Sequence, residues 1–175
     1  MSINRMKEEH APLSFEQIYQ SENGRIRRLL YQMVGQDDVD DLVQETFSRC
    51  WLALDGFDRR CAIGSWVYQV ALNVARDHWR RVKRKWWLIS SDVESACSEN
   101  NNEMRTVERD LLRRALMALS FKDRYLIVMF YIEEMDTKEI SLILEIPAGT
   151  VKSRLFAARK KLKKKLSQLG VSFDE

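Results

Sequence analysis

The segment from Thr137 to Leu162 reads TKEISLILEIPAGTVKSRLFAARKKL and holds two stretches of helical periodicity. A short break, EIPAG at residues 145–149, separates them. Apolar residues recur at helical spacing on one face of each stretch: Ile140, Ile143 and Leu144 in the first, and Val151, Leu155, Ala158 and Leu162 in the second. This pattern predicts two helices packed across a tight turn, which is a helix-turn-helix.

The second of these helices carries a basic face. The residues opposite its apolar stripe are Lys152, Ser153, Phe156, Arg159 and Lys160. We expect Pro147 at the first helical position and Thr150 in the first turn, where exposed backbone amides are favourable neighbours for a phosphate. A helix of this kind fits the major groove of DNA. The alternative is an ordinary helical hairpin whose basic face is only solvated.

The composition indicates an all-α protein. The chain has 175 residues, of which 45% are hydrophobic and 31% charged, with two prolines and six glycines. This length and this apolar content suffice for one domain or two small ones. Repeated periods of 3.6 residues, with few alternating stretches, favour helices over strands.

Charge is distributed in blocks along the chain. The formal net charge is only +3. Residues 76–85 and 152–165 are basic clusters, whereas residues 37–45 and 92–108 are predominantly acidic. Separate basic and acidic surfaces predict two kinds of partner, a polyanion and a basic protein surface.

Several function classes are disfavoured by the residues present. Cys50, Cys61 and Cys97 have no paired spacing, and His10 and His78 complete no zinc-binding pattern. There is no pattern of a nucleophile with its base and no glycine-rich phosphate loop, so we expect neither an enzyme nor a cofactor.

The first residues lack the apolar core of a signal peptide, and the longest apolar run is too short to span a bilayer. We expect a soluble cytoplasmic protein without membrane insertion.

Three helices are predicted to form a first module. They run from Ser14 to Gly35, from about Asp38 to Leu54, and from the end of a loop at residues 55–65 to about Lys85. The third is expected to bury one face, made of Trp66, Val67, Val70, Ala71, Val74 and His78. We expect Trp66 to be a core residue rather than one that stacks on a base.

The predicted organisation is a tail at residues 1–13, a helical module at 14–87, a linker at 88–106 and a second helical module at 107–175. Residues 90–106 are too polar to bury a core and should be mobile. In the second module, Ser120 with Asp123 and Asp136 with Glu139 are expected to cap helices. Gly170 is expected to end the last helix.

The two modules together resemble the extracytoplasmic-function sigma factors, the smallest members of the sigma-70 family. The first module carries DDLVQETF at residues 40–47 and SWVYQVALNVARD at residues 65–77, similar to the family's regions 2.2 to 2.4. The second carries IPAGTVKSR at residues 146–154, similar to region 4. Leu119-Ser120 stands where the family often has Leu-Pro. The resemblance implies a non-catalytic subunit that brings core RNA polymerase to a subset of promoters and helps open them.

The acidic cluster at residues 37–45 acquires a role from this resemblance. Carboxylates near the start of a helix are stabilised by the positive end of its dipole. This effect would explain one or two of the acidic residues, but not so dense a group. The matching surface in the family docks on the clamp helices of the largest polymerase subunit. The candidate core-binding residues are therefore Asp37, Asp40, Asp41, Gln44 and Glu45.

Two sets of DNA contacts are implied as well. The minus-ten candidates are Arg59, Arg60, Ser65, Asn73, Arg76 and Arg80, from the loop at residues 58–64 and one helix face. Asn and Arg side chains can bind base edges and phosphates, although that face could also be merely solvated. The minus-thirty-five candidates are Thr150, Lys152, Ser153, Arg154, Phe156, Arg159 and Lys160. Ala157 occupies a position where some members have Arg.

The resemblance further implies three partners: core RNA polymerase, through the clamp helices of its largest subunit and the flap of its second-largest subunit; promoter DNA; and a cognate anti-sigma factor. The stretch from Trp86 to Glu108 could span at most about 75 Å, which exceeds the roughly 50 Å between two DNA sites one and a half helical turns apart.

The rival interpretation is an autonomous helix-turn-helix regulator. Such proteins usually dimerise on palindromic sites, and no separate dimerisation segment is evident.

Overall fold

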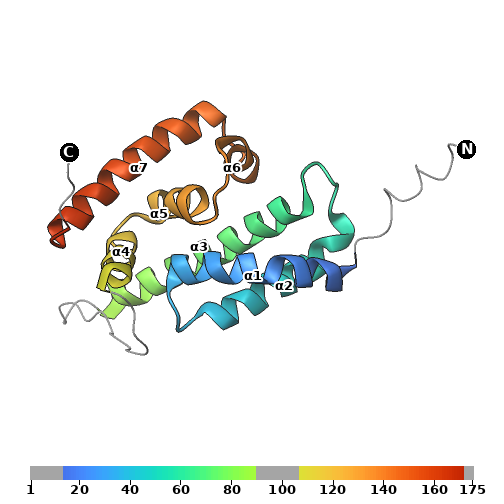
Figure 1. Ribbon diagram of the computed structural model, residues 1–175. Helices are drawn as coiled ribbons and strands as arrows, with labels where there is room; N and C mark the ends of the chain where they lie inside the picture. The colour runs from blue at the N-terminus through green and yellow to red at the C-terminus, as the bar shows by residue number, and fades with distance from the viewer. Residues whose placement is uncertain (1–13, 90–106, 172–175) are drawn as a thin grey trace, which may run out of the picture.

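The computed structural model describes residues 14–89 and 107–171, and it is helical throughout, without strands, over those residues (Figure 1). The helices are α1 (Phe15–Val34), α2 (Val39–Ala53), the short η2 (Leu54–Gly56), α3 (Ile63–Ile89), α4 (Val107–Met117), α5 (Phe121–Ile127), η3 (Val128–Ile132), α6 (Thr137–Leu144) and α7 (Ala148–Gln168). The all-α fold and the two helical modules are confirmed. The expected tail and mobile linker lie outside the described residues, except that α3 continues through positions 88 and 89.

The first module is a bundle of α1, α2 and α3, each in contact with the other two. The apolar stripe of α1 ends at Gly35, whose φ of 98° lies in the region that favours glycine and stops the helix. Ile26, Leu29 and Leu30 from this stripe are fully buried. Burial of this apolar surface is the main force holding the three helices together.

The burial of α3 is broader than its sequence predicts. Val67, Ala71 and Val74 are buried as expected, whereas Trp66, Val70 and His78 are only half-buried. A second stripe at the same spacing is buried next to the first: Tyr68, Leu72 and Ala75. Two buried stripes on one helix require neighbours on more than one side, and α3 contacts α1 and α2 in its own module and α5 and α6 in the other.

The second module begins each of its central helices with a side-chain cap. The Ser120 hydroxyl accepts a hydrogen bond from the backbone N–H of Asp123 at 3.2 Å, at the start of α5. At the start of α6, Asp136 and Glu139 form a reciprocal capping box. Both predicted caps are confirmed. The helix that follows Ser120 widens into one π-helical turn, η3.

The turn between α6 and α7 differs slightly from the expectation. Glu145 ends α6 in the left-handed conformation, with φ of 53°. Pro147 is the N-cap of α7 rather than its first helical residue, because its ψ of 141° is extended. Gly149 therefore lies inside the first turn of α7 and not in the break. The predicted apolar stripe of α7 is confirmed, with Val151, Leu155 and Ala158 buried.

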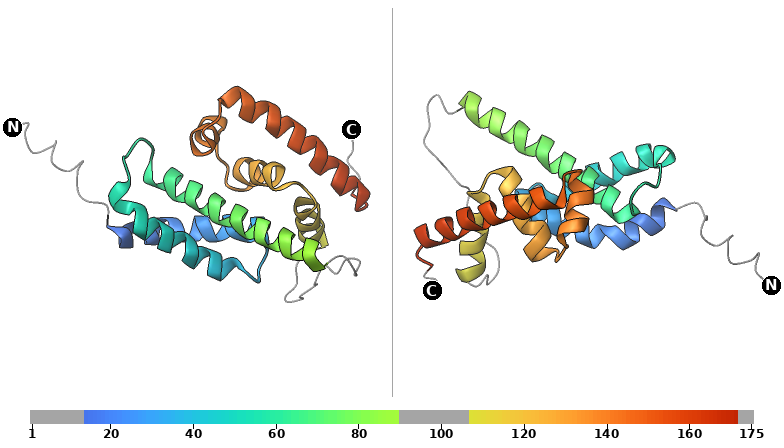
Figure 2. Two further views of the ribbon diagram at one scale, coloured as in Figure 1. Left: turned by 180° about the vertical axis from the view of Figure 1, so that it is seen from behind. Right: turned by 90° about the horizontal axis from the view of Figure 1, so that it is seen from above.

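The two modules are packed against each other, although the sequence predicts only a tether between them. One continuous hydrophobic core includes residues of both. Helices α4 and α5 contact α1, and α5 and α6 contact α3 (Figure 2). The Trp79 ring of α3 lies 6.0 Å from the Phe121 ring of α5. The second module therefore adds to the burial that α1 and α2 give α3.

Arg124 of α5 is a buried cation at this junction. Its guanidinium donates hydrogen bonds to the carbonyls of Leu116 at 3.0 Å and Met117 at 2.8 Å, near the end of α4. It also donates to the carbonyl of Met33, in the last turn of α1. Helix C-termini offer unpaired carbonyls and a negative dipole end, so one charge stabilises two helix ends. Burial lowers the pKa of Arg124 to about 10, and the side chain remains charged at neutral pH.

Candidate polymerase and promoter interfaces

The candidate polymerase-binding surface lies on α2 and the turn before it. Asp37, Asp40, Asp41 and Gln44 are exposed there, as expected. Asp40 pairs with Arg27 of α1. Beside them an open groove runs between α1 and α2, with Phe15, Tyr19, Phe47 and Trp51 among its lining residues. The side chain of Trp51 is 61% exposed. Acidic and aromatic side chains thus lie together on one face, a combination that suits a protein partner.

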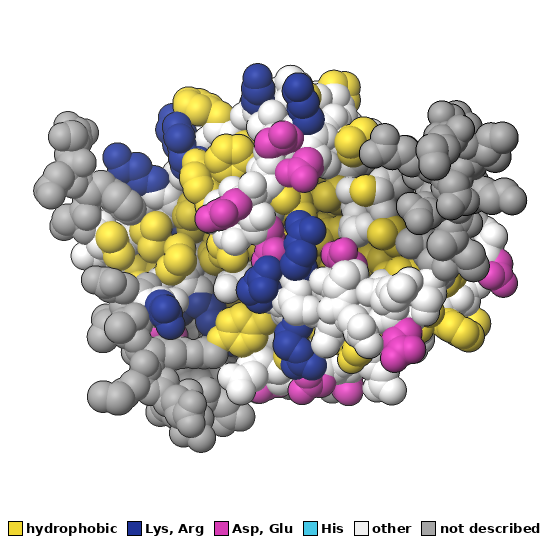
Figure 3. Space-filling model, turned by 45° about the vertical axis from the view of Figure 1, so that its right-hand side comes forward, with side chains coloured by type: hydrophobic (Ala, Val, Ile, Leu, Met, Phe, Trp, Pro, Cys, Tyr) yellow, Lys and Arg dark blue, Asp and Glu magenta, His cyan; other side chains and the backbone are white. Residues whose placement is uncertain are grey.

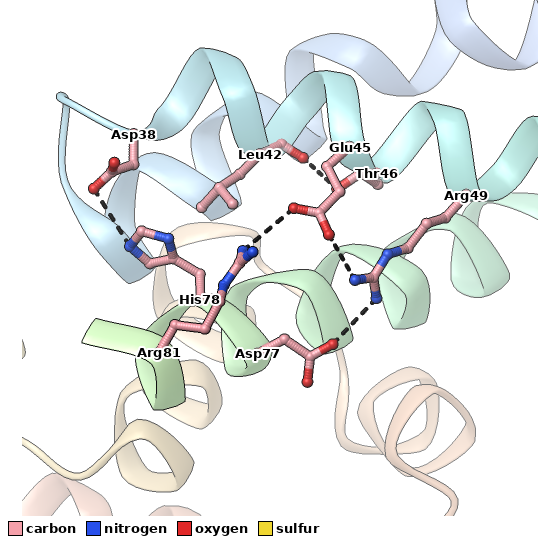
Figure 4. A network of polar contacts seen from close by, with 8 residues as sticks. All are labelled: Asp38, Leu42, Glu45, Thr46, Arg49, Asp77, His78 and Arg81. Atoms are coloured by element: carbon pink, nitrogen blue, oxygen red, sulfur yellow. Dashed lines mark hydrogen bonds and ion pairs between the residues drawn. The ribbon is translucent and has the colours of Figure 1, made fainter. Parts of the chain in front are cut away.

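Glu45 occupies a different position from its acidic neighbours. Its carboxylate lies between α2 and α3, 2.6 Å from Arg49 and 3.4 Å from Arg81 (Figure 4). Arg49 in turn is 3.2 Å from Asp77 of α3. A second cross-helix pair joins His78 to Asp38 at 3.3 Å. Glu45 therefore ties α2 to α3 and is less accessible to a partner than Asp41.

The minus-ten candidates fall on α3 and the loop before it. Asn73 and Arg80 are exposed on α3, whereas Arg76 is half-buried. Arg59 and Arg60 are exposed in the loop, and Ser65 is half-buried in the first turn of α3. This surface offers amide and guanidinium groups of the kind that read base edges and grip phosphates.

The loop before α3 has a defined shape. Arg59 adopts a left-handed conformation, with φ of 58°. The Asp58 carboxylate accepts from the backbone N–H of Arg60 at 3.2 Å and pairs with its guanidinium at 2.7 Å. At the base of the loop, the rings of Phe57 and Trp66 lie 5.1 Å apart. Trp66 thus packs on the base of the loop and is only half-buried, at the edge of the core rather than within it as expected.

The minus-thirty-five candidates line one face of α7. Those that the structure leaves exposed are Lys152, Ser153, Arg154, Phe156, Arg159 and Lys160. Thr150 is half-buried, and its carbonyl accepts from the Ser153 hydroxyl at 3.1 Å. Phe156 is 65% exposed, with the Arg159 guanidinium 6.0 Å from its ring. An apolar ring amid cations suits contact with a thymine methyl group between phosphate contacts.

On one face of the described part of the molecule, basic side chains do not form an uninterrupted field (Figure 3). Figure 3 shows a face on which Lys and Arg alternate with acidic and hydrophobic side chains. Among the described residues no group of three or more His, Cys, Asp or Glu is placed to hold a metal ion. No helix within the described residues is long and apolar enough to cross a membrane.

Sequence reasoning missed one polar cluster, which lies where the modules meet. It comprises Glu133 at the end of η3, Arg25 and Arg28 on α1, and Tyr68 on α3. The Glu133 side chain is 1% exposed. Its acidic neighbour Glu134 is exposed, and nothing in the local pattern distinguishes the two residues. Only the packing of one module on the other buries Glu133.

Comparisons with known proteins assign the family. A model described as Sigma-70 region 2 matches residues 18–85, and one described as Sigma-70, region 4 matches residues 109–162. The chain is 30% identical to the ECF RNA polymerase sigma factor SigW of Bacillus subtilis over 172 residues, which cover 89% of this chain and 90% of SigW. The chain belongs to the extracytoplasmic-function sigma factors of the sigma-70 family.

Two solved structures have a similar fold. One is the sigma factor RpoE in complex with the anti-sigma factor NepR from Bartonella quintana, with a TM-score of 0.71 and 21% identity over 87% of this chain and 96% of RpoE. The other is CnrH in complex with the cytosolic domain of CnrY, with a TM-score of 0.65 and 26% identity over 88% of each chain. The chain is accordingly an alternative RNA polymerase sigma factor, and the autonomous regulator is not favoured.

Proposed function

We propose that this sigma factor divides its contacts among three surfaces. The acidic face of α2 docks on the clamp helices of the largest subunit of core polymerase, α3 with its preceding loop holds the minus-ten element, and α7 enters the major groove at minus-thirty-five. The second module would also meet the flap of the second-largest subunit. The protein acts in the cytoplasm, without a catalytic step of its own.

The observation that carries this proposal is the presence of two basic helix faces within one sigma-family chain. Asn73 and Arg80 on α3, and Lys152 and Arg154 on α7, are all exposed. Each face is backed by a buried apolar stripe that fixes its orientation. If these faces served only to keep charges in water, neither Asn73 among the arginines of α3 nor the exposed Phe156 of α7 would be needed. Both features suit base contacts.

Run-off transcription tests the proposal. We expect purified core polymerase with this protein to give specific transcripts from promoters that neither component transcribes alone. The protein by itself should bind promoter duplex weakly, because each module makes few contacts and two weak sites add only when both are engaged. Tight sequence-specific binding by the protein alone, with no transcript when core is added, would favour the autonomous regulator instead.

We further propose a cognate anti-sigma factor as a partner. Its support is the open groove between α1 and α2, together with the similar folds of RpoE and CnrH, which were solved bound to NepR and to CnrY respectively. A partner seated in that groove would compete with core polymerase for the same face. The test is competition: a partner recovered with the tagged protein should be displaced by core. Simultaneous binding of both would contradict a shared face.

A further inference from the structure

A carboxylate from α1 is buried against the start of α3, away from the surfaces proposed above for polymerase and DNA. It belongs to Glu22, whose side chain is only 12% exposed. Its Oε2 atom is buried and accepts no hydrogen bond from any described residue. A carboxylate in this position has lost most of its hydration, so something else must offset that loss.

The neighbour of the Glu22 carboxylate on α3 is Gly64, the second residue of that helix. A Cβ atom at position 64 would lie 3.0 Å from Glu22 Oε1 and 3.3 Å from Oε2. These distances are shorter than an ordinary van der Waals contact, so a methyl group there would displace the carboxylate. The missing side chain of Gly64 therefore lets Glu22 lie directly against the helix backbone.

The start of a helix stabilises a carboxylate. The first backbone N–H groups of α3 have no carbonyl partner within the helix, and the helix dipole places partial positive charge there. Arg25 brings a second positive charge, 3.9 Å from Glu22 Oε2, but the same guanidinium also lies 3.9 Å from Glu133. Because Arg25 is divided between two carboxylates, the amino end of α3 contributes to holding Glu22 in place.

The contact between Glu22 and Gly64 lies at one end of the loop that we assign to the minus-ten element. This loop covers residues 58–64 and leads from the end of α2 and η2 into α3 (Figure 1). Ser65, a further minus-ten candidate, follows Gly64 directly. The other end of the loop is held by the ring of Phe57, 5.1 Å from that of Trp66. Both ends of the loop are thus tied to the bundle.

The loop depends on these ties for its position. None of residues 58–64 is fully buried, and Arg59 and Arg60 are exposed. A segment with few buried contacts of its own moves locally at little cost in free energy. Side chains that read DNA bases must be held in place by residues behind them, and a loop needs this support more than a helix does.

We propose that Glu22 is a positioning residue for promoter recognition, whose carboxylate against Gly64 holds the start of α3 and with it the minus-ten loop. Glu22 does not touch DNA itself. This inference rests on the proposed function of the loop. It predicts that changes at position 22 or 64 loosen the loop and reduce discrimination among minus-ten sequences.

A spin label on Cys61 tests the contact without DNA or polymerase. Cys61 lies within the loop and is half-exposed. Cys50 is buried, and burial raises the pKa of its thiol to about 12, which makes it unreactive near neutral pH. With Cys97→Ser, the label goes to the loop alone. We expect Glu22→Ala, Glu22→Gln and Gly64→Ala each to increase the mobility of the label, because each weakens or displaces the same carboxylate contact.

Matched variants on α1 separate this contact from general effects of charge or helix propensity. Glu16→Ala removes a carboxylate from an exposed position. Gly24→Ala adds a methyl group at a helical glycine where a Cβ would meet nothing within 4 Å. Both should leave the mobility of the label unchanged. Changes equal to those at positions 22 and 64 would overturn the proposal.

The double variant tests whether the two residues act through one contact. In Glu22→Ala with Gly64→Ala, the added methyl group has no carboxylate to displace. We therefore expect the mobility of the label to rise no further than in the stronger single variant. Fully additive effects would show that positions 22 and 64 act independently, and would overturn the proposal.

Strand opening on a set of promoters tests the consequence for recognition. With core polymerase, permanganate reactivity is compared between one promoter and versions of it with single-base substitutions in the minus-ten element. We expect Glu22→Ala and Gly64→Ala to reduce this discrimination several-fold, with core binding and preference among minus-thirty-five sequences unchanged. A uniform loss on every minus-ten sequence would show only a structural role and would overturn the positioning role.

The outcomes separate this inference from the proposed function. If the unmodified protein opens no promoter with core, the proposed function fails, and the spin label still decides whether Glu22 holds the loop. A more mobile loop with unchanged minus-ten discrimination overturns the positioning role and leaves the sigma-factor function standing. Unchanged label mobility in the variants at positions 22 and 64 contradicts the contact itself.

Discussion

Helices α3 and α7 both present basic faces, but they have different surroundings. Helix α7 buries one apolar stripe and leaves Lys152, Arg154 and Arg159 exposed. Helix α3 buries two stripes, and Arg76 on its candidate face is half-covered. In the proposed assignment, the basic face of α7 is open to DNA, whereas part of the α3 face is covered by the second module. The accessibility of a basic helix face therefore depends on the module packed beside it and not on the spacing of its own residues.

The largest effect on stability is expected at Arg124, which connects the end of α1 to α4 and α5. Arg124→Leu leaves several buried carbonyls without a donor, and we expect a loss of about 3 kcal/mol in the free energy of unfolding. Chemical denaturation measures it. Arg114→Leu, an exposed arginine in the last turn of α4, is the control and should cost far less. Equal stabilities of the two variants would show that the buried guanidinium is not a structural link.

On α7 the comparison can be sharpened by separating base reading from charge. Arg154→Ala should change the preference among minus-thirty-five sequences, with a lost base contact worth about 1–3 kcal/mol. Lys164→Ala, near the far end of the same helix, should weaken all sequences alike and reduce the salt slope by about one. Binding of holoenzyme to promoter variants at several salt concentrations measures both. Identical behaviour of the two variants would mean that α7 contacts only phosphates.

On α2, substitution by lysine should have different effects at two carboxylates of similar sequence context, Asp41 and Glu45. Asp41→Lys is a change at an exposed residue and should weaken binding to core polymerase with unchanged stability. Glu45→Lys breaks the pairs with Arg49 and Arg81 and should also destabilise the fold, by about 1 kcal/mol or less because these pairs are partly exposed. Core pull-down and thermal unfolding of each variant distinguish them. Unaffected pull-down by Asp41→Lys would remove this surface from the docking site.

The sequence predicts those features of the structure that depend only on residues a few positions apart. The stripes of α6 and α7, the caps at Ser120 and Asp136, and the exposed face of α7 follow from spacing alone, because each depends on residues within a few positions. The burial of Glu133 does not, because the arginines beside it belong to the other module. Glu45 shows the same limit: its position in the acidic run predicts exposure, but α3 brings Arg81 to it. The individual promoter contacts remain predictions.

Permanganate reactivity of unpaired thymines near the start site tests the central claim most directly, because strand opening distinguishes a sigma factor from a protein that only tethers polymerase. With core polymerase and this protein on a duplex promoter, we expect reactive thymines that neither component produces alone. Asn73→Ala with Arg80→Ala should retain core binding and lose most of that reactivity, with a pre-melted template restoring the part due to melting. Undiminished reactivity in this double variant would contradict the assignment of the α3 face to the minus-ten element.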